Sequence, residues 1–226
     1  MAAVRRDLGG MRIVHHSRCT TRGSPLSPRP SMHAYPLRVS FRKLAFTRQA
    51  AVRDSADRLL LYMKQKAFSL KERVTVFSDE AQTLQAYAIV ADRVIDISGV
   101  HAITTAGGAA VGSVKRHGMR SIWRAHYDVM HGGTIAFTIR EANPWVKVID
   151  GLMGEIPIVG LFAGYVFHPA YVVARPDGAA VLRVEKQPAL FEGRFEVTRE
   201  GALTDPEEEL AVLGVLVMLL HERRRG

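Results

Sequence analysis

The sequence predicts a mainly β domain in which antiparallel strands close into a barrel around a buried helix near the C-terminus. From Tyr35 onward, short apolar segments alternate with polar turn sequences, as in consecutive β-hairpins. The segment Leu210–Leu220 is apolar on every side, which is typical of a helix buried inside protein. The composition, with 47% hydrophobic and 23% charged residues, is that of a globular chain able to bury a sizeable core.

Four pairs of segments are predicted as hairpins because the two members of each pair flank a short turn sequence. Two of these turns contain Gly-Gly and one contains Asp-Gly, and such residues adopt the positive φ angles that tight hairpins need. The fourth turn is Ser78-Asp79-Glu80. The predicted strand pairs are Arg73–Phe77 with Leu84–Val90, His101–Thr105 with Ala109–Val114, Tyr127–Met130 with Thr134–Ile139, and Ala170–Ala174 with Ala179–Val184.

The C-terminal helix is predicted over residues 206–222. Thr204 or Asp205 is the candidate N-cap, Pro206 suits the first turn, and Glu207 begins an acidic run that complements the positive end of the helix dipole. The apolar run Leu210–Leu220 is shorter than the roughly 20 residues that a bilayer span requires. A curled sheet can enclose such a helix, so we expect the strands to close around it.

The stretch of residues 143–169 interrupts the hairpin pattern. Asn143 is positioned as the N-cap of a helix over Trp145–Met153, and Phe162–His168 is predicted as a strand. Glycines and prolines between these segments argue against one long regular element. We expect this apolar stretch to cover one end of the barrel.

Residues 1–34 differ in composition from the rest of the chain. Within residues 1–31, six arginines against one aspartate account for +5 of the chain's net charge of +9, so the remainder is only mildly basic. We predict either a disordered basic tail or a start placed upstream of a true beginning at Met32, with the folded domain over residues 35–226. No secretory signal is visible in this stretch. The single cysteine, Cys19, excludes an intrachain disulfide framework and favours a reducing, cytoplasmic location.

A weak internal repeat places cations at equivalent positions of successive hairpins. Each copy ends one strand with a cation, crosses a short apolar connection and begins the next strand at an arginine; the third copy runs from Lys186 to Arg194. If equivalent strand ends meet at one barrel rim, the cations of the first two copies would attract phosphates or anionic lipid headgroups there. The alternative is ordinary solubility and protection of strand edges. The candidate anion-binding residues are Lys64, Lys66, Lys71, Arg73, Lys115, Arg116, Arg120 and Arg124.

No constellation of residues predicts a catalytic centre, a metal site or a cofactor. His117 and His126 are nine positions apart, a spacing that puts them on opposite faces of one continuous strand, so we interpret them and His131 as exposed strand-end residues. The histidines and cysteine of the N-terminal tail lack further ligands at zinc spacing. The glycine pairs lack a phosphate-binding pattern, and Asp92 and Asp96 have no matching second pair of carboxylates.

Two motifs resemble the superfamily of LURP-one-related, tubby C-terminal-like and phospholipid-scramblase-like proteins. The first is Lys-x-Lys-x-Phe-Ser-Leu-x-x-Arg-x-Thr-Val at Lys64–Val76, and the second is Asn-Pro-Trp followed by Glu-Ile-Pro, Gly-Tyr-Val-Phe and Pro-Ala-Tyr at Asn143–Tyr171. The final acidic cap, apolar helix and Glu222-Arg-Arg-Arg also resemble uncharacterised bacterial members. The resemblance covers residues 35–226 and implies a closed barrel of about twelve strands around a central helix.

The resemblance also implies where to look for function. In this superfamily, tubby proteins bind phosphoinositides through basic residues, scramblase-type members are linked to lipid movement, and LURP-one-related members have no agreed activity. The chain lacks the cysteine-rich and proline-rich segments of scramblases, which puts palmitoyl anchoring and scrambling in doubt.

The sequence therefore predicts a non-enzymatic binding or scaffold protein that recognises anionic phospholipid headgroups or another phosphorylated ligand at a basic rim. One alternative is a peripheral membrane or scramblase-related protein that uses the C-terminal helix as an anchor, supported by Arg223–Arg225 after the apolar run. A second alternative is a nucleic-acid-binding barrel, which the overall charge favours. Aromatic residues interleaved with the cations, which would supply base stacking, are not evident.

Overall fold

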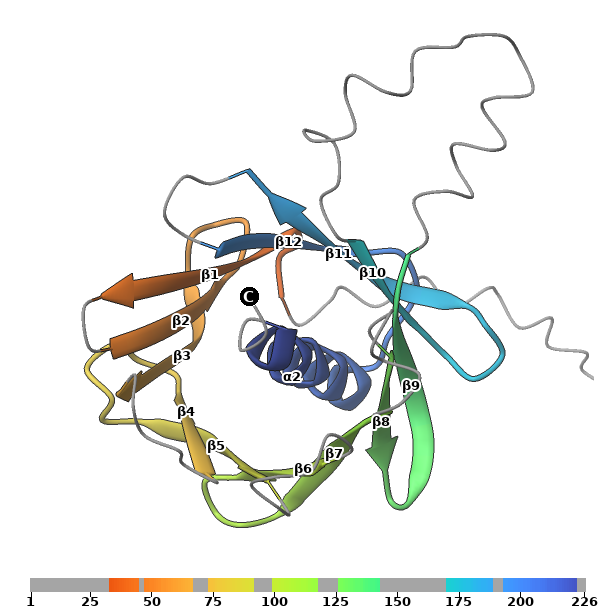
Figure 1. Cartoon of the computed structure of the whole chain (residues 1–226), viewed down its shortest axis with the longest axis horizontal. Coiled ribbons are helices and arrows are strands. Elements are labelled where there is room, and N and C mark those ends of the chain that lie inside the picture. Colours follow the sequence, from red (N-terminus) through yellow and green to blue (C-terminus); the bar gives the residue numbers. More distant parts are fainter. Residues whose placement is uncertain are drawn as a thin grey trace, which may run out of the picture.

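The computed structural model describes residues 33–44, 47–66, 73–91, 99–117, 126–142, 170–188 and 193–222. Over these residues, twelve antiparallel strands form a closed barrel around the C-terminal helix α2 (Asp205–Glu222), as Figure 1 shows. Each strand pairs with its neighbours along the chain, and β1 closes the barrel by pairing with β12. The predicted fold class, a mainly β closed barrel of about twelve strands around a C-terminal helix, is confirmed.

The strands follow one another around the barrel in sequence order. They are β1 (Leu37–Leu44), β2 (Thr47–Arg53), β3 (Leu59–Lys66), β4 (Arg73–Phe77), β5 (Gln85–Ala91), β6 (Val100–Thr105), β7 (Ala110–Arg116), β8 (His126–His131), β9 (Thr134–Glu141), β10 (Ala170–Ala174), β11 (Ala180–Gln187) and β12 (Gly193–Arg199).

Strand residues alternate between the core and the outer surface because successive side chains point to opposite faces of a strand. In β10, Tyr171 and Val173 are buried while their neighbours are partly exposed. The same alternation occurs in β4, where Val74 and Val76 are buried. These inward side chains and those of α2 form one hydrophobic core, so the space inside the barrel is packed with apolar groups.

Helix α2 is apolar on every side because strands surround it. Its residues from Leu210 to Leu219 are all buried, Gly214 among them. A Cβ atom placed on Gly214 would lie 2.8 Å from Cγ2 of Val129, so a glycine is needed where the helix passes β8. Among the described residues, no helix has both the length and the apolar character that crossing a lipid bilayer demands.

The start of α2 is fixed by a local cap. The carboxylate of Glu207 accepts hydrogen bonds from the backbone N–H and the hydroxyl of Thr204 at 2.8 and 2.9 Å. This is the back-reaching half of a capping box, in which the third helical residue satisfies the N-cap backbone. Of the two N-cap candidates, Thr204 therefore has this role.

Most sequence predictions of strands and helix agree with the structure. Strands β4 and β10 match residue for residue, and the other six predicted hairpin strands and the helix begin and end within three residues of their predicted bounds. Strands β1, β2, β3 and β12 were given no predicted bounds. The helix predicted over Trp145–Met153 and the strand predicted over Phe162–His168 lie outside the described residues.

Residues 1–32 of the predicted tail also lie outside the described residues. The next two residues contact the barrel. The backbone N–H of His33 donates to Oε1 of Glu208 at 3.3 Å, and the carbonyl of Ala34 accepts from the N–H of Ser55 at 2.9 Å. The described residues begin at His33, two positions before the predicted boundary at Tyr35, and the boundary itself stays a prediction.

Candidate functional site

The two ends of the barrel are distinguished by the direction of α2. Because neighbouring strands are antiparallel, β1, β3, β5, β7, β9 and β11 all run in the same direction. We call the end of the barrel where these strands begin the helix-start mouth, and the end where they finish the helix-end mouth. A Cβ atom placed on Gly112, near the start of β7, would lie 2.6 Å from Leu210. At the other end of the helix, Glu222 accepts a 2.7 Å hydrogen bond from the hydroxyl of Tyr127, near the start of β8. The helix therefore runs parallel to β7.

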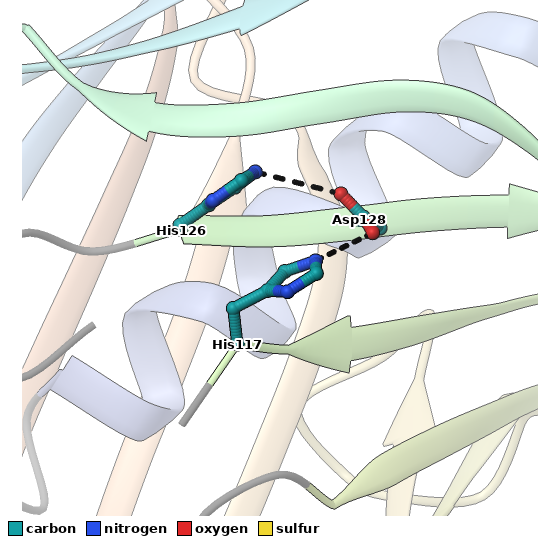
Figure 2. Close-up of side chains that lie close together, drawn as sticks. All are labelled: His117, His126 and Asp128. Carbon is teal, nitrogen blue, oxygen red and sulfur yellow. Dashed lines mark hydrogen bonds and ion pairs between the residues drawn. The ribbon is translucent and has the colours of Figure 1, made fainter. Parts of the chain in front are cut away.

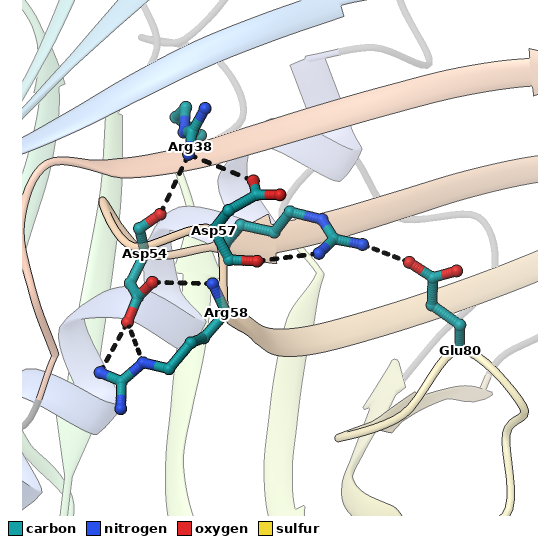
Figure 3. Close-up of polar contacts among 6 residues, drawn as sticks. Arg38, Asp54, Asp57, Arg58 and Glu80 are labelled. Carbon is teal, nitrogen blue, oxygen red and sulfur yellow. Dashed lines mark hydrogen bonds and ion pairs between the residues drawn. The ribbon is translucent and has the colours of Figure 1, made fainter.

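Charges at the helix-start mouth pair with one another, and Figure 3 shows one such group in the β2–β3 turn. The carboxylate of Asp54 is fully buried and accepts hydrogen bonds from the backbone N–H of Arg58 at 2.9 Å and from its Nε at 2.7 Å. Burial alone would raise the pKa of Asp54, but the hydrogen bonds from Arg58 outweigh it and the pKa is lowered. The group is therefore a fixed structural carboxylate.

The neighbouring cations in Figure 3 are also paired. Arg38 contacts the carboxylate of Asp57 at 3.2 Å, and Arg53 forms an ion pair with Glu80 of the β4–β5 turn. Arg53 also donates to the carbonyl of Asp57 at 3.0 Å. These pairs link the start of β1 to the β2–β3 turn, and the end of β2 to the β4–β5 turn, at the same mouth.

Two further arginines of the helix-start mouth bind the acidic first turn of α2. Arg175 contacts both carboxylate oxygens of Glu207, at 2.5 and 3.1 Å. Arg199 lies 3.5 Å from the fully buried carboxylate of Glu208. Positive charge at this mouth is therefore neutralised within the fold.

At the helix-end mouth, in contrast, several exposed cations have no ion pair with a carboxylate among the described residues. Among the described side chains, seven exposed cations lie on strands at or near their ends at this mouth. Arg42 and Arg194 interact with other residues, which leaves five. Within the part of the chain that the structure describes, none of the five forms an ion pair with a carboxylate. We call this set the basic rim: Lys64 of β3, Arg73 of β4, Lys115 of β7, Arg140 of β9 and Lys186 of β11.

The basic rim includes three of the eight predicted anion-binding residues, namely Lys64, Arg73 and Lys115. Arg116 lies at the same mouth but is 9% exposed, and its guanidinium stands over the ring of Tyr127 at 5.9 Å from the centroid. Lys66 is the last residue of β3, but its side chain is not described. Lys71, Arg120 and Arg124 lie entirely outside the described residues. Anion binding by any of the eight stays a prediction.

Two rim cations were absent from that prediction. Lys186 opens the third copy of the internal repeat, so its position in the sequence did carry a signal. Arg140 has no counterpart in the repeat. It is exposed near the end of β9, and its ladder partner is His126 of β8.

Polar side chains inside the barrel lie behind the rim. His221 of α2 meets His101 of β6 with 3.0 Å between their Nε2 atoms, and the rings form an edge-to-face pair. A hydrogen bond between two imidazole nitrogens needs one to donate and the other to accept, so the two tautomers are linked. Burial, then the charges of Glu222 and Glu141, raise the pKa of Tyr171, which keeps its hydroxyl protonated.

A second polar cluster lies on the outer face of β7 and β8, beside the basic rim. Figure 2 shows His117, which directly follows β7, close to His126 and Asp128 of β8. Nε2 of His117 lies 2.6 Å from one carboxylate oxygen of Asp128, and Nε2 of His126 lies 3.6 Å from the other. The imidazole rings are stacked, with centroids 4.4 Å apart and planes 23° apart. We call these three residues the His–Asp cluster.

The histidine positions correct the sequence interpretation. Residues 117 and 126 lie opposite each other across the β7–β8 pair, and the backbone N–H of His117 donates to the carbonyl of His126 at 3.0 Å. Cross-strand partners share a face, so the assumption of one continuous strand was wrong. Their side chains are 34% and 23% exposed, and Asp128 is almost buried. They are thus not the freely exposed strand-end residues we predicted.

Comparisons with known proteins add a distant structural likeness. No protein-family model matches the chain, and no curated protein matches it in sequence. A solved structure, the X-ray structure of a protein from Arabidopsis thaliana, is 15% identical to this chain with a TM-score of 0.44. The match covers 85% of this chain and 93% of the plant protein.

Proposed function

We propose that the protein is a non-enzymatic binding protein whose basic rim recognises phosphorylated anionic headgroups at a lipid surface. One observation carries the proposal: the two mouths of the barrel differ in how their cations are paired with carboxylates. At the helix-start mouth, arginines pair with carboxylates of the fold, whereas the rim cations Lys64, Arg73, Lys115, Arg140 and Lys186 are exposed and have no ion pair within the described residues.

Electrostatics favours an extended anionic surface as the ligand. The rim cations come from five different strands distributed around one end of the barrel, so they present charge over an area instead of converging on a single point. Each Lys or Arg held near an anionic membrane surface contributes about 1 kcal/mol. Arginine adds the ability to bind a phosphate through two parallel hydrogen bonds.

The closed barrel around a buried C-terminal helix is also the architecture expected of the LURP-one-related, tubby-like and scramblase-like superfamily, and membership is part of this proposal. The anchor alternative would require residues 210–219 of α2 to leave the core in which they are buried. The rim proposal needs no such rearrangement, so we favour it over the anchor.

Vesicle flotation tests the rim. The full chain should float with phosphatidylcholine vesicles that contain phosphatidylserine or a phosphoinositide, and should not float with phosphatidylcholine alone. The variant Lys64→Gln/Arg73→Gln/Lys115→Gln should bind roughly 100-fold more weakly, because three contributions of about 1 kcal/mol are removed. Binding should also weaken as salt is added, since these charges are exposed.

The matched control removes the same net charge at the other mouth. Ala56→Glu/Leu84→Glu/Ala106→Glu places three acidic residues in exposed turns at the helix-start mouth. This variant should keep most of the lipid affinity. An equal loss in both variants would mean that net charge alone governs binding, and the rim proposal would fail. Competition by soluble inositol phosphate would show whether a free phosphate can replace the lipid.

A further inference from the structure

We propose that the His–Asp cluster, formed by His117, His126 and Asp128, is a binding site for a divalent zinc ion on the outer face of the barrel. One nitrogen from each imidazole and one carboxylate oxygen would serve as ligands. Within the described residues, these three are the group of potential metal ligands that come together, with all ligand atoms within 4.8 Å of one another.

The ligand types and their orientation fit zinc. Two imidazoles and one carboxylate are a common protein set for this ion, which leaves a fourth position for water or a ligand oxygen. Both histidines point Nε2 at the carboxylate of Asp128, from 2.6 and 3.6 Å. Bonds of about 2.0–2.2 Å in tetrahedral geometry separate ligand atoms by roughly 3.3 Å. The two histidine–aspartate separations fall on either side of that value, and all three ligand atoms lie within 4.8 Å of one another, so side-chain rotations would be needed to close the site around an ion.

Two of these side chains lie on β8, and the third directly follows β7 and is held to β8 by a backbone hydrogen bond. His117 and His126 are cross-strand partners, and Asp128 is two residues along β8 on the same outer face. Its neighbours Tyr127 and Val129 point inward and are fully buried, which fixes the direction of the carboxylate between them. A site built on paired strands is more precise than one built on loops.

The buried carboxylate of Asp128 is stabilised by positive charge next to it. Asp128 is only 8% exposed, and a carboxylate removed from water is costly unless a cation or several hydrogen bonds compensate. The two imidazoles can meet this need through a proton or through a shared metal ion. The ladder places Lys115 opposite Asp128 and Arg140 opposite His126, so two cations lie on strands beside the site.

Metal binding is tested on the full chain in a background of His15→Gln/His16→Gln/Cys19→Ser, which removes competing ligands of the N-terminal segment. Isothermal titration with zinc should show one site. His117→Gln and His126→Gln, each of which removes one ligand, should each weaken binding by at least about 100-fold. Co²⁺ should give the intense visible absorption of a tetrahedral site in the background protein and lose it in both variants.

The matched control is His131→Gln, at the far end of β8. His131 is exposed and its Nδ1 contacts the carbonyl of Val111 at 2.9 Å, outside the His–Asp cluster. This variant should bind zinc as the background protein does. Lys115→Gln should bind zinc more tightly because a positive charge next to Asp128 is removed.

Thermal unfolding of each variant, measured without and with zinc, distinguishes loss of the metal site from loss of the fold. Zinc should raise the unfolding midpoint of the background protein and of His131→Gln, and should have no such effect on the folded His117→Gln and His126→Gln proteins. If the background protein binds no zinc, or binds it equally well after either ligand is replaced, the cluster is a structural ion pair only and the proposal is overturned.

Discussion

Gly214 of α2 packs so closely against Val129 of β8 that the structure leaves no room for a side chain at this position. A Cβ atom at this position would lie 2.8 and 3.3 Å from the two γ-carbons of Val129, which is itself fully buried. Gly214→Ala should therefore lower the free energy of unfolding by about 1–3 kcal/mol through overpacking. The better helix propensity of alanine, up to about 1 kcal/mol, offsets only part of this cost. Urea unfolding measures the change.

A double-mutant cycle identifies the clash as the cause. Val129→Ala alone should be destabilising because it leaves a cavity, but Gly214→Ala combined with Val129→Ala should be more stable than the sum of the single changes predicts. Gly107→Ala is the control, because a Cβ there would meet nothing nearer than 3.9 Å. Strict additivity in the cycle would contradict the proposed contact.

At the scale of elements, the start of α2 predicts how stability depends on pH. The guanidinium of Arg175 hydrogen-bonds to Glu207, and this contact, opposed by burial and aided by Thr204, lowers the pKa of Glu207 to about 2. Because the folded pKa lies below the unfolded value of about 4.5, the carboxylate stabilises the fold above that pH. The stabilisation is lost as the pH falls from about 4.5 towards 2.

Glu207→Gln removes this contribution. Urea unfolding should find the variant less stable near neutral pH by about 1–2 kcal/mol, a value reduced for solvent screening because the Glu207 side chain is 31% exposed. The difference from the unchanged protein should shrink as the pH approaches 2. Glu185→Gln, at an exposed carboxylate of β11, is the control and should change little at any pH. A difference independent of pH would contradict the role of the ionised carboxylate.

The boundaries of strands and helices were predictable where the sequence contains both turn-forming residues and a pattern of buried apolar residues. Gly108, Gly133 and Gly178 adopt the positive φ angles that the hairpin turns require, so the flanking strands could be placed from glycine alone. Helix α2 was predictable because capping and apolar composition agree. Strands β1 and β2 lack such a turn signal, and β1 also pairs with β12, which is distant in the sequence.

The candidate site was only partly predictable because it depends on which strands become neighbours. The repeat indicated cations at equivalent strand ends, and Lys64, Arg73 and Lys115 do lie at one mouth. It could not show that Arg116 turns inward over Tyr127. The His–Asp cluster was missed because a spacing of nine residues means opposite faces in one strand but the same face across a hairpin.

At the scale of the whole molecule, closure removes the exposed strand edges that an open sheet would present. The closure is uneven around the barrel. Strands β1 and β2 share a ladder of seven residue pairs, whereas Tyr62 and Phe77 form the one pair recorded between β3 and β4 among the described residues. Across this seam, Arg53 of β2 forms an ion pair with Glu80 beyond β4, which links the two sides at the helix-start mouth.

The β3–β4 seam should therefore open before the rest of the barrel. Hydrogen exchange followed at single amides should show faster exchange for the amides of β4 that face β3 than for those that face β5, because β4 shares five residue pairs with β5. Glu80→Gln removes the ion pair that spans the seam, so exchange should rise there and stay unchanged between β1 and β2. Equal protection on both sides of β4 would show that the seam is as firmly closed as the other strand pairs, and that the barrel opens as a single unit.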